Sequence, residues 1–225
     1  MFVGCGVEAD VFVAALTRGA QTVAAQPMLS PRHRTAWNTR LRELGAHSGV
    51  SVVLPPAEQG TGVQPAILRT TLAAWRRDAG LRDECFGPSI IVVDCATPDD
   101  LAAAALDIPG SLTATLWVDA EDAGLARTLL PRLVQAAGRV VHDGVPTGVE
   151  VCHAMVHSGP FPACSRPDTT SVGPHAMRRW CRPVALQNFP DALLPLELQE
   201  SNPQRIMRQV DGVCVLPGGT TGSAS

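Results

Sequence analysis

The sequence predicts a doubly wound α/β fold, in which a mostly parallel sheet carries helices on both faces. Three observations favour it. Strand-like and helix-like segments alternate through residues 1–142, as they do in βαβ units. Residues 89–93 form a continuous apolar run rich in Ile and Val, which is typical of a strand buried on both faces. Residues 8–18 repeat apolar side chains at the spacing of one helical face.

Turn and cap residues divide the first half of the chain. Ser30 is a suitable N-cap, and Pro31 a suitable first residue, for a helix that runs to residue 47. Pro55 and Pro56 end the apolar segment that precedes them. We therefore expect, in chain order, a strand at 1–3, helices at 8–18 and 31–47, strands at 50–54 and 65–70, and a helix at 72–80.

The alternation continues after the strand at 89–93. Thr97 or Pro98 begins a helix, and Asp99 and Asp100 suit the positive end of its dipole. Gly138 is interpreted as the C-cap of a helix that precedes it. The expected order is a helix to residue 106, a strand at 113–118, a helix at 121–137 and a strand at 139–142.

The regular pattern stops at Gly144. Residues 144–174 are rich in Gly, Pro, Ser, Thr and His, and a loop of this length inside a compact domain is usually functional or disordered. Residues 178–187 then favour one more strand, and Pro183 favours an edge position for it. The composition of residues 217–225 predicts disorder.

Composition excludes several classes of function. Charged residues make up 17% of the chain and give a net charge of −3, without the clustered Lys and Arg that bind nucleic acid. No apolar run approaches the roughly 20 residues of a membrane span, and residues 1–8 lack the pattern of a secretory signal. Seven cysteines without a CxxC pair indicate reduced thiols in a cytoplasmic protein. We expect no nucleic-acid or membrane partner.

A first candidate site is Gly4-x-Gly6-x-x-Ala9, which follows a strand and begins a helix like a dinucleotide-binding fingerprint. Its glycines would let a pyrophosphate approach the start of the helix. The acidic residue expected about 20 residues further on to bind the ribose is missing, because residues 26–30 contain no Asp or Glu. An ordinary strand-to-helix turn is the favoured interpretation.

A second candidate is the segment 83–88, whose Gly87-Pro88 forces a turn before the strand at 89–93. The turn leaves Glu84 and Phe86 near a strand end, and α/β sheets bind ligands at strand ends. The Glu84 carboxylate could accept two hydrogen bonds from a ribose, and the Phe86 ring could pack beside a flat nicotinamide. The chemistry alone favours the plainer alternative, a helix-terminal glutamate and a core phenylalanine.

A third candidate combines Cys152, His153 and His157. If this segment were helical, the two imidazoles would share a face and could bind a metal. If Cys152 met a histidine, its thiolate could act as a nucleophile. No third ligand has a suitable spacing, so we expect no metal site. The favoured interpretation is that these residues line or support a pocket.

Two sets of residues carry a family resemblance. The sequence Glu84-Cys85-Phe86-Gly87-Pro88 resembles the E-x-F-G-P motif of the aldehyde dehydrogenases. Residues 144–163, together with 169–173 and 188–195, resemble the carboxy-terminal end of the 2,5-dioxovalerate (α-ketoglutarate semialdehyde) dehydrogenases. The resemblance extends from Met1 to about Gly212, and the long loop is its more specific part.

The resemblance implies a role for each region. Residues 1–175 would be part of a catalytic domain, in which Glu84 holds the nicotinamide ribose hydroxyls of NAD or NADP and Phe86 packs at the nicotinamide. Residues 176–190 would contain an oligomerisation strand, 177–186, which joins the sheet of an identical partner. The remaining residues, 191–225, would be a tail that is disordered from residue 213.

The loop 144–174 would form part of the entrance for a small-molecule aldehyde. The entrance residues implied in this way are Cys152, His153, His157 and Phe161. The loop also departs from the family pattern at three positions. Ser158 stands where the family has Gly, and Cys164 and Pro174 stand where Thr is usual.

The catalytic groups of the family have no counterpart in this sequence. The family uses a cysteine nucleophile, an asparagine in the oxyanion site and a glutamate base. Cys5 follows the first strand instead of preceding it, so it does not match the nucleophile. The resemblance therefore implies no catalytic residue in this chain, no dehydrogenase activity of the chain alone, and weak or no NAD(P) binding. A truncated gene, a misassigned start and a non-catalytic interaction or oligomerisation module stay open as alternatives.

Overall fold

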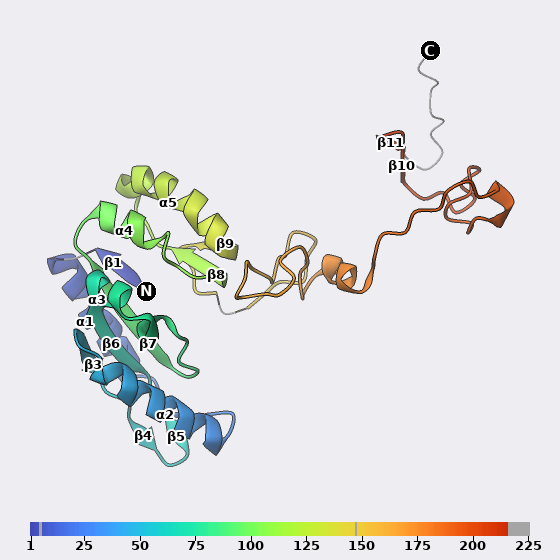
Figure 1. Ribbon diagram of the computed structural model, residues 1–225. Helices are drawn as coiled ribbons and strands as arrows, with labels where there is room; N and C mark the ends of the chain where they lie inside the picture. Colours follow the sequence, from blue (N-terminus) through green and yellow to red (C-terminus); the bar gives the residue numbers. More distant parts are fainter. Residues whose placement is uncertain (5, 147, 216–225) are drawn as a thin grey trace. The chain divides into compact units, whose positions relative to one another are not determined.

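The computed structural model describes residues 1–4, 6–146 and 148–215 (Figure 1). The chain divides into two compact units, one up to Arg179 and one from Trp180 onward. The expectations for Cys5 and for residues 217–225 lie outside the described residues. Among the described helices, none is both long and apolar enough to cross a bilayer.

The main sheet of the first unit has four strands. Their order across the sheet is β1 (Phe2–Gly4), β7 (Ser89–Cys95), β6 (Ala66–Thr71) and β3 (Val50–Leu54). The strands β1, β7 and β6 are parallel, and β3 is an antiparallel edge strand. Val93 of β7 gives the register, because it pairs with Phe2 of β1 on one side and with Thr70 of β6 on the other. The predicted parallel-rich sheet is therefore confirmed, with one antiparallel edge.

Helices cover both faces of this sheet (Figure 1). On one face, Val13 of α1 (Val7–Gln21) packs on Ile67 and Val92. On the other face, Leu68 and Val93 meet apolar side chains of three helices. These helices are α2 (Pro31–Ala46), α3 (Leu72–Arg77) and α4 (Pro98–Ala104). Neighbouring residues of β6 and β7 thus serve opposite faces, as the period of two in a strand requires.

The helices α2 and α4 begin after the N-cap residues that the sequence predicts. The Ser30 side chain accepts a hydrogen bond from the His33 N–H at 3.4 Å, with Pro31 as the first helical residue. The Thr97 hydroxyl accepts one from the Asp100 N–H at 3.0 Å and caps α4 in the same way. Each cap satisfies an amide that has no partner inside the helix, which is the reason that Ser and Thr mark helix starts.

A second, parallel pair of strands, β8 (Ser111–Leu116) and β9 (Ala137–His142), follows the main sheet in sequence. Leu129 and Leu133 of α5 (Ala123–Ala136) cover the pair together with alanines of the α4 region. The remaining short elements are β2 (Gln26–Pro27), β4 (Glu58–Gln59) and β5 (Gly62–Val63), which form one small sheet, and the 3-10 helices η1 (Ala79–Arg82) and η2 (Ala120–Asp122).

The interpretation of Gly138 as a helix cap is wrong. The helix α5 ends at Ala136, the next residue, Ala137, is already extended, and Gly138 lies inside β9. A Cβ on Gly138 would clash with the backbone carbonyl of Ser158. Glycine stands here because the loop crosses the strand at this point, and not because a left-handed residue has to close a helix.

The described residues of the long loop contain no helix or strand before Pro174, in agreement with the end of the regular pattern in the sequence. It packs nevertheless on the starts of β8 and β9. A Cβ on Gly110 would clash with the Phe161 carbonyl, and a Cβ on Gly159 would clash with the Ser111 carbonyl. Backbone approach this close needs glycine at the contact. The loop is therefore a packed covering of the strand pair.

The strand expected at 177–186 is absent from the described chain, so this prediction is wrong for the chain alone. Residues 174–180 form the 3-10 helix η3 (Pro174–Trp180), and residues 181–187 have no regular structure. A strand exists only when another strand accepts and donates its backbone hydrogen bonds. The described residues supply no such neighbour for this segment.

The described residues of the second unit form a 3-10 helix, η4 (Asp191–Leu193), and a hairpin. The hairpin pairs β10 (Arg208–Val210) with β11 (Val213–Val215) through Asp211 and Gly212, whose φ angles are 49° and 84°. Two residues with positive φ make the tight turn that suits a hairpin. The expected disorder from residue 213 is therefore wrong for residues 213–215.

Candidate functional site

A cleft of about 300 Å³ lies at the amino edge of the main sheet. Its walls are the turn at residues 83–87, the start of β7, Leu44 of α2 and Leu68 of β6. The sequence-predicted residues Glu84 and Phe86 both line this cleft. The structure thus brings together the two residues that the sequence assigns to cofactor binding.

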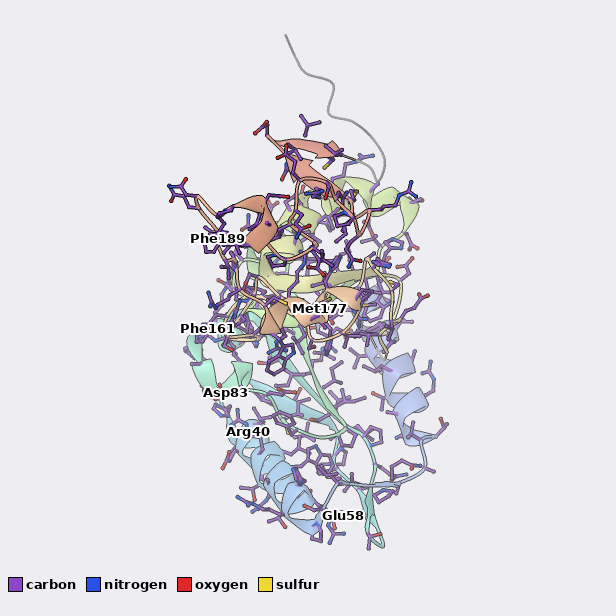
Figure 2. All side chains as sticks on the ribbon, turned by 90° about the vertical axis from the view of Figure 1, so that its right-hand side faces the viewer. Arg40, Glu58, Asp83, Phe161, Met177 and Phe189 are labelled. Carbon is purple, nitrogen blue, oxygen red and sulfur yellow. The ribbon has the colours of Figure 1, made fainter. Side chains whose placement is uncertain are left out.

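Side chains of α2 hold the turn in place. Arg40 pairs with Asp83 at 3.8 Å and also donates a hydrogen bond to the Gly80 carbonyl, and Figure 2 shows Arg40 close to Asp83. A Cβ on Gly87 would clash with the buried indole ring of Trp37. The E-x-F-G-P glycine is therefore required by the close approach of the turn to α2.

The turn presents Glu84 and Phe86 outward. Cys85, between them, packs against the core, whereas Glu84 and Phe86 are exposed, Phe86 with 71% of its surface accessible. The alternative of a core phenylalanine is therefore wrong. Within the described part of the chain, the Glu84 carboxylate makes no hydrogen bond or ion pair. An unpartnered carboxylate and an exposed ring on one turn can bind hydroxyl groups and a flat heterocycle.

The reasoning from strand ends needs correction. The turn precedes β7, and Ser89 pairs with Ala66 at the start of β6. The cleft therefore lies at the amino ends of these parallel strands, whereas open α/β sheets bind ligands outside the carboxyl ends. The position of Glu84 and Phe86 comes from the contacts of the turn with α2, and not from the general rule on strand ends.

The dinucleotide fingerprint at Gly4 and Gly6 gains no support. The first turn of α1 carries Glu8 and Asp10, whose charges oppose a phosphate at this helix end. Asp10 is paired with Arg69 at 2.7 Å, and Arg69 also contacts Asp94 at 2.8 Å. These carboxylates hold the pKa of Arg69 above its usual value, Asp94 first. The network ties α1 to β6 and β7, so its role is structural.

The four entrance residues differ in their contacts and exposure. The His153 ring meets His175 edge to face, with centroids 6.1 Å apart. His157 is anchored by its backbone, since its N–H donates to the Thr170 hydroxyl at 2.8 Å. Phe161, labelled in Figure 2, is 80% exposed. Cys152 is half-buried.

The metal and nucleophile interpretations of this segment have no geometric support. Residues 152–157 are not helical, so His153 and His157 do not share a helical face. Among the described residues, no three His, Cys, Asp or Glu side chains lie close enough to hold a metal ion. For Cys152, no histidine contact is found among the hydrogen bonds and ring contacts of the described loop.

Sequence reasoning missed one pair of interacting residues, Ser158 and Cys164. The pKa of the Cys164 thiol is lowered, first by the Ser158 hydroxyl and then by the Arg166 backbone N–H, which donates to the sulfur at 3.4 Å. Only the departures from the family pattern at both positions marked these residues in the sequence. Nothing in the spacing shows that they meet, because the loop between them has no regular period.

Searches for similar proteins give related sequences but no matching family model. The chain is 43% identical over 201 residues to an α-ketoglutaric semialdehyde dehydrogenase 2 of Azospirillum brasilense, a match that covers 87% of this chain and 38% of that protein. It is 37% identical over 207 residues to an α-ketoglutaric semialdehyde dehydrogenase of Acinetobacter baylyi, with 91% and 39% covered. The chain thus spans about two fifths of the length of these relatives.

Solved structures share the fold. A lactaldehyde dehydrogenase superposes with a TM-score of 0.61 at 19% sequence identity. The match covers 80% of this chain and 38% of the lactaldehyde dehydrogenase chain. An NAD⁺ complex of an aldehyde dehydrogenase from Bacillus cereus gives 0.59 at 17% identity, with 80% and 37% covered. The resemblance stated from the sequence is confirmed for this portion of such a protein, and so is the fold class.

Proposed function

We propose that this chain, which matches two fifths of an α-ketoglutaric semialdehyde dehydrogenase, supplies part of the catalytic domain of an enzyme of that class. Such an enzyme oxidises a semialdehyde to the acid and passes a hydride to NAD or NADP. The observation that carries the proposal is the turn with Glu84 and Phe86, held against α2 at the mouth of a cleft.

Glu84 and Phe86 would bind the nicotinamide half of the nucleotide. The Glu84 carboxylate has no partner among the described residues, so it can accept hydrogen bonds from both ribose hydroxyls without losing an existing contact. The Phe86 ring is accessible and can pack beside the nicotinamide. Two contacts are a small part of a dinucleotide site, so we expect weak or no binding of NAD or NADP by this chain alone.

The packed loop would form one side of the aldehyde entrance. Its backbone is anchored on the starts of β8 and β9, while Phe161 and His153 stay accessible on its surface. An anchored backbone with accessible aromatic and polar side chains is suited to selecting a small substrate. The described cysteines are not joined in disulfides, which agrees with a reducing compartment, and we propose the cytoplasm as the location of the protein.

An exchange of segments tests this function. The segment of the Azospirillum brasilense relative that matches this chain is replaced by residues 1–215, and the chimera is assayed with α-ketoglutaric semialdehyde and NAD or NADP. We expect oxidation by the chimera and none by the 225-residue chain alone. A chimera that folds by circular dichroism but oxidises no aldehyde contradicts the proposal, and so does activity of the chain alone.

The same chimera tests Glu84. The substitution Glu84→Ala removes charge-assisted hydrogen bonds, which contribute about 1.5–3 kcal/mol, so we expect the KM for the nucleotide to rise about tenfold or more. Asp119→Ala is the matched control, because Asp119 is an exposed carboxylate outside the cleft. An unchanged KM in Glu84→Ala would remove Glu84 from the cofactor site.

A non-catalytic role in association is the second candidate, and the second unit favours it. Large apolar side chains of this unit are exposed, Trp180 with 89% of its surface. Residues 177–186 would then form a strand in the sheet of an identical partner chain. Light scattering after size-exclusion chromatography of the 225-residue chain should show an oligomer. A monomer at high concentration would contradict self-association.

A further inference from the structure

We propose that Arg40 of α2 is a positioning residue for the nucleotide, because it fixes the turn at residues 83–87. Glu84 and Phe86 extend from this turn. The lining of the cleft does not include Arg40, so Arg40 would act through the turn and not by touching NAD or NADP. The inference rests on the proposed function, in which Glu84 and Phe86 bind the nicotinamide half. It adds a residue that lies outside the E-x-F-G-P motif.

Apolar contacts fix the backbone on either side of Glu84 but not at Glu84 itself. Leu81, in η1, is 3% exposed, and Cys85 packs against the same core. The residues between them, 82–84, are all exposed. Burial therefore does not set the direction of the Glu84 carboxylate, and the polar contacts of this short stretch decide it.

The Arg40 guanidinium contacts this stretch at two points. One of its nitrogens donates a hydrogen bond to the Gly80 carbonyl, and the same nitrogen lies 3.8 Å from the Asp83 carboxylate (Figure 2). Solvent weakens the ion pair because Asp83 is largely exposed, so the part-buried bond to the carbonyl is the stronger contact. The other terminal nitrogen pairs with Glu43 of α2 at 3.4 Å. The guanidinium thus bridges the helix and the turn.

Arg40 belongs to one face of α2 that follows the turn. Trp37 lies against Gly87, where an added Cβ would clash with the indole ring, and Leu44 lines the cleft beside the turn. The three positions are three and four residues apart, which places them on one side of a helix. Trp37 and Leu44 are fully buried, so changing either would also damage the core. Arg40 is half-buried and allows the turn to be tested separately from the core.

A turn that is ordered before binding gives a higher affinity for the nucleotide. If the turn moves freely, Glu84 and Phe86 seldom face the nucleotide together, and binding has to order them. The entropy lost in this step is subtracted from the affinity. The aldehyde entrance is not affected in this way, because it belongs to the loop at residues 144–174.

Hydrogen exchange in the 225-residue chain tests whether Arg40 fixes the turn. In Arg40→Ala, we expect the amides of residues 83–87 to exchange about threefold or more faster than in the parent, while those of β7 keep their rate. Arg76→Ala is the matched control, because Arg76 forms an ion pair with Asp107 at 2.6 Å outside the cleft. An unchanged rate at 83–87 in Arg40→Ala would overturn the proposal, and so would an equal rise in Arg76→Ala.

Kinetics of the chimera test the effect on the nucleotide. Arg40→Ala should raise the KM for NAD or NADP about threefold or more and leave the KM for the aldehyde unchanged. In a chimera that already carries Glu84→Ala and Phe86→Ala, the same change should raise the nucleotide KM by less than about 1.5-fold, because Arg40 acts through these two side chains. An equal rise in both backgrounds would overturn the proposal.

The outcomes also separate this inference from the proposed function. A chimera in which Glu84→Ala leaves the nucleotide KM unchanged contradicts the proposed function and this inference with it. A chimera in which Glu84→Ala raises the nucleotide KM and Arg40→Ala does not overturns the role of Arg40 alone.

Discussion

The residues up to His142 and the residues from Trp180 onward differ in how far their apolar side chains are buried. All hydrophobic residues that are buried in the described chain lie at or before Ala137, in the cores around the two sets of strands. In the described part of the second unit no side chain is buried. The first region therefore gains stability from its own packing, whereas the second leaves apolar surface for another chain to cover.

This comparison predicts that replacing Leu by Ala costs much more stability in the first region than in the second. Leu44→Ala should destabilise the chain by about 2–5 kcal/mol, because Leu44 is fully buried between α2 and the sheet. Leu193→Ala should change the stability by less than about 0.5 kcal/mol, because Leu193 is largely exposed in η4. Urea unfolding followed by circular dichroism measures both. Equal losses would mean that the second unit has a packed core of its own.

The long loop, residues 144–174, packs on β8 and β9, so a substitution at this contact should also cost stability. Gly138→Ala should destabilise by about 1–3 kcal/mol, because the new methyl group would clash with the Ser158 carbonyl. The control is Gly124→Ala in α5, where a Cβ meets nothing within 4 Å and alanine should stabilise the helix by about 0.5–1 kcal/mol. Thermal unfolding compares the two variants. A loss in both, or in neither, would contradict the contact between loop and strand.

A smaller effect on the stability of the fold should appear at low pH, through Asp78. His47 and, less strongly, the Gly80 N–H lower the pKa of Asp78. A carboxyl group with a lowered pKa stabilises the fold above its unfolded value, and the stabilisation is lost as the pH falls through the folded value. Asp78→Asn should therefore be less stable than the parent at pH 6, with a difference that shrinks as the pH falls below 3.8, the ordinary pKa of an aspartate side chain.

Glu197→Gln in the second unit is the matched control for this pH dependence. Glu197 is exposed and has no hydrogen bond or ion pair among the described residues, so the variant should follow the parent at every pH. Urea midpoints at several pH values give both curves. A constant difference between Asp78→Asn and the parent down to pH 2 would show that the carboxylate charge is not the cause.

Local chemistry explains why much of the fold can be predicted from the sequence. Ser30 and Thr97 each cap the helix that follows them. Such caps can be predicted from the sequence, because the cap hydrogen bond joins residues three apart in the chain. The apolar run at 89–93 becomes the first five residues of β7 for the same local reason, since Ile and Val suit a pleated, covered strand. Glu84 and Phe86 were found because they belong to one contiguous motif.

Properties that depend on distant residues could not be read in this way. The need for glycine at 138 comes from Ser158, and that at 87 comes from Trp37 of α2. The lowering of the Cys164 pKa by Ser158 involves two residues of a loop without a period, so no spacing could indicate it.

The sequence by itself thus determined the helix starts, the parallel-rich α/β class, the length of the irregular loop and the outline of the candidate cofactor turn. Only the tertiary structure decided that this turn lies at the amino edge of the sheet, that the loop is packed, and that residues 177–186 form no strand within the described chain. The physical reason is that caps and periodicity act within a few residues, whereas close backbone contacts and strand pairing depend on which distant segments the fold brings together.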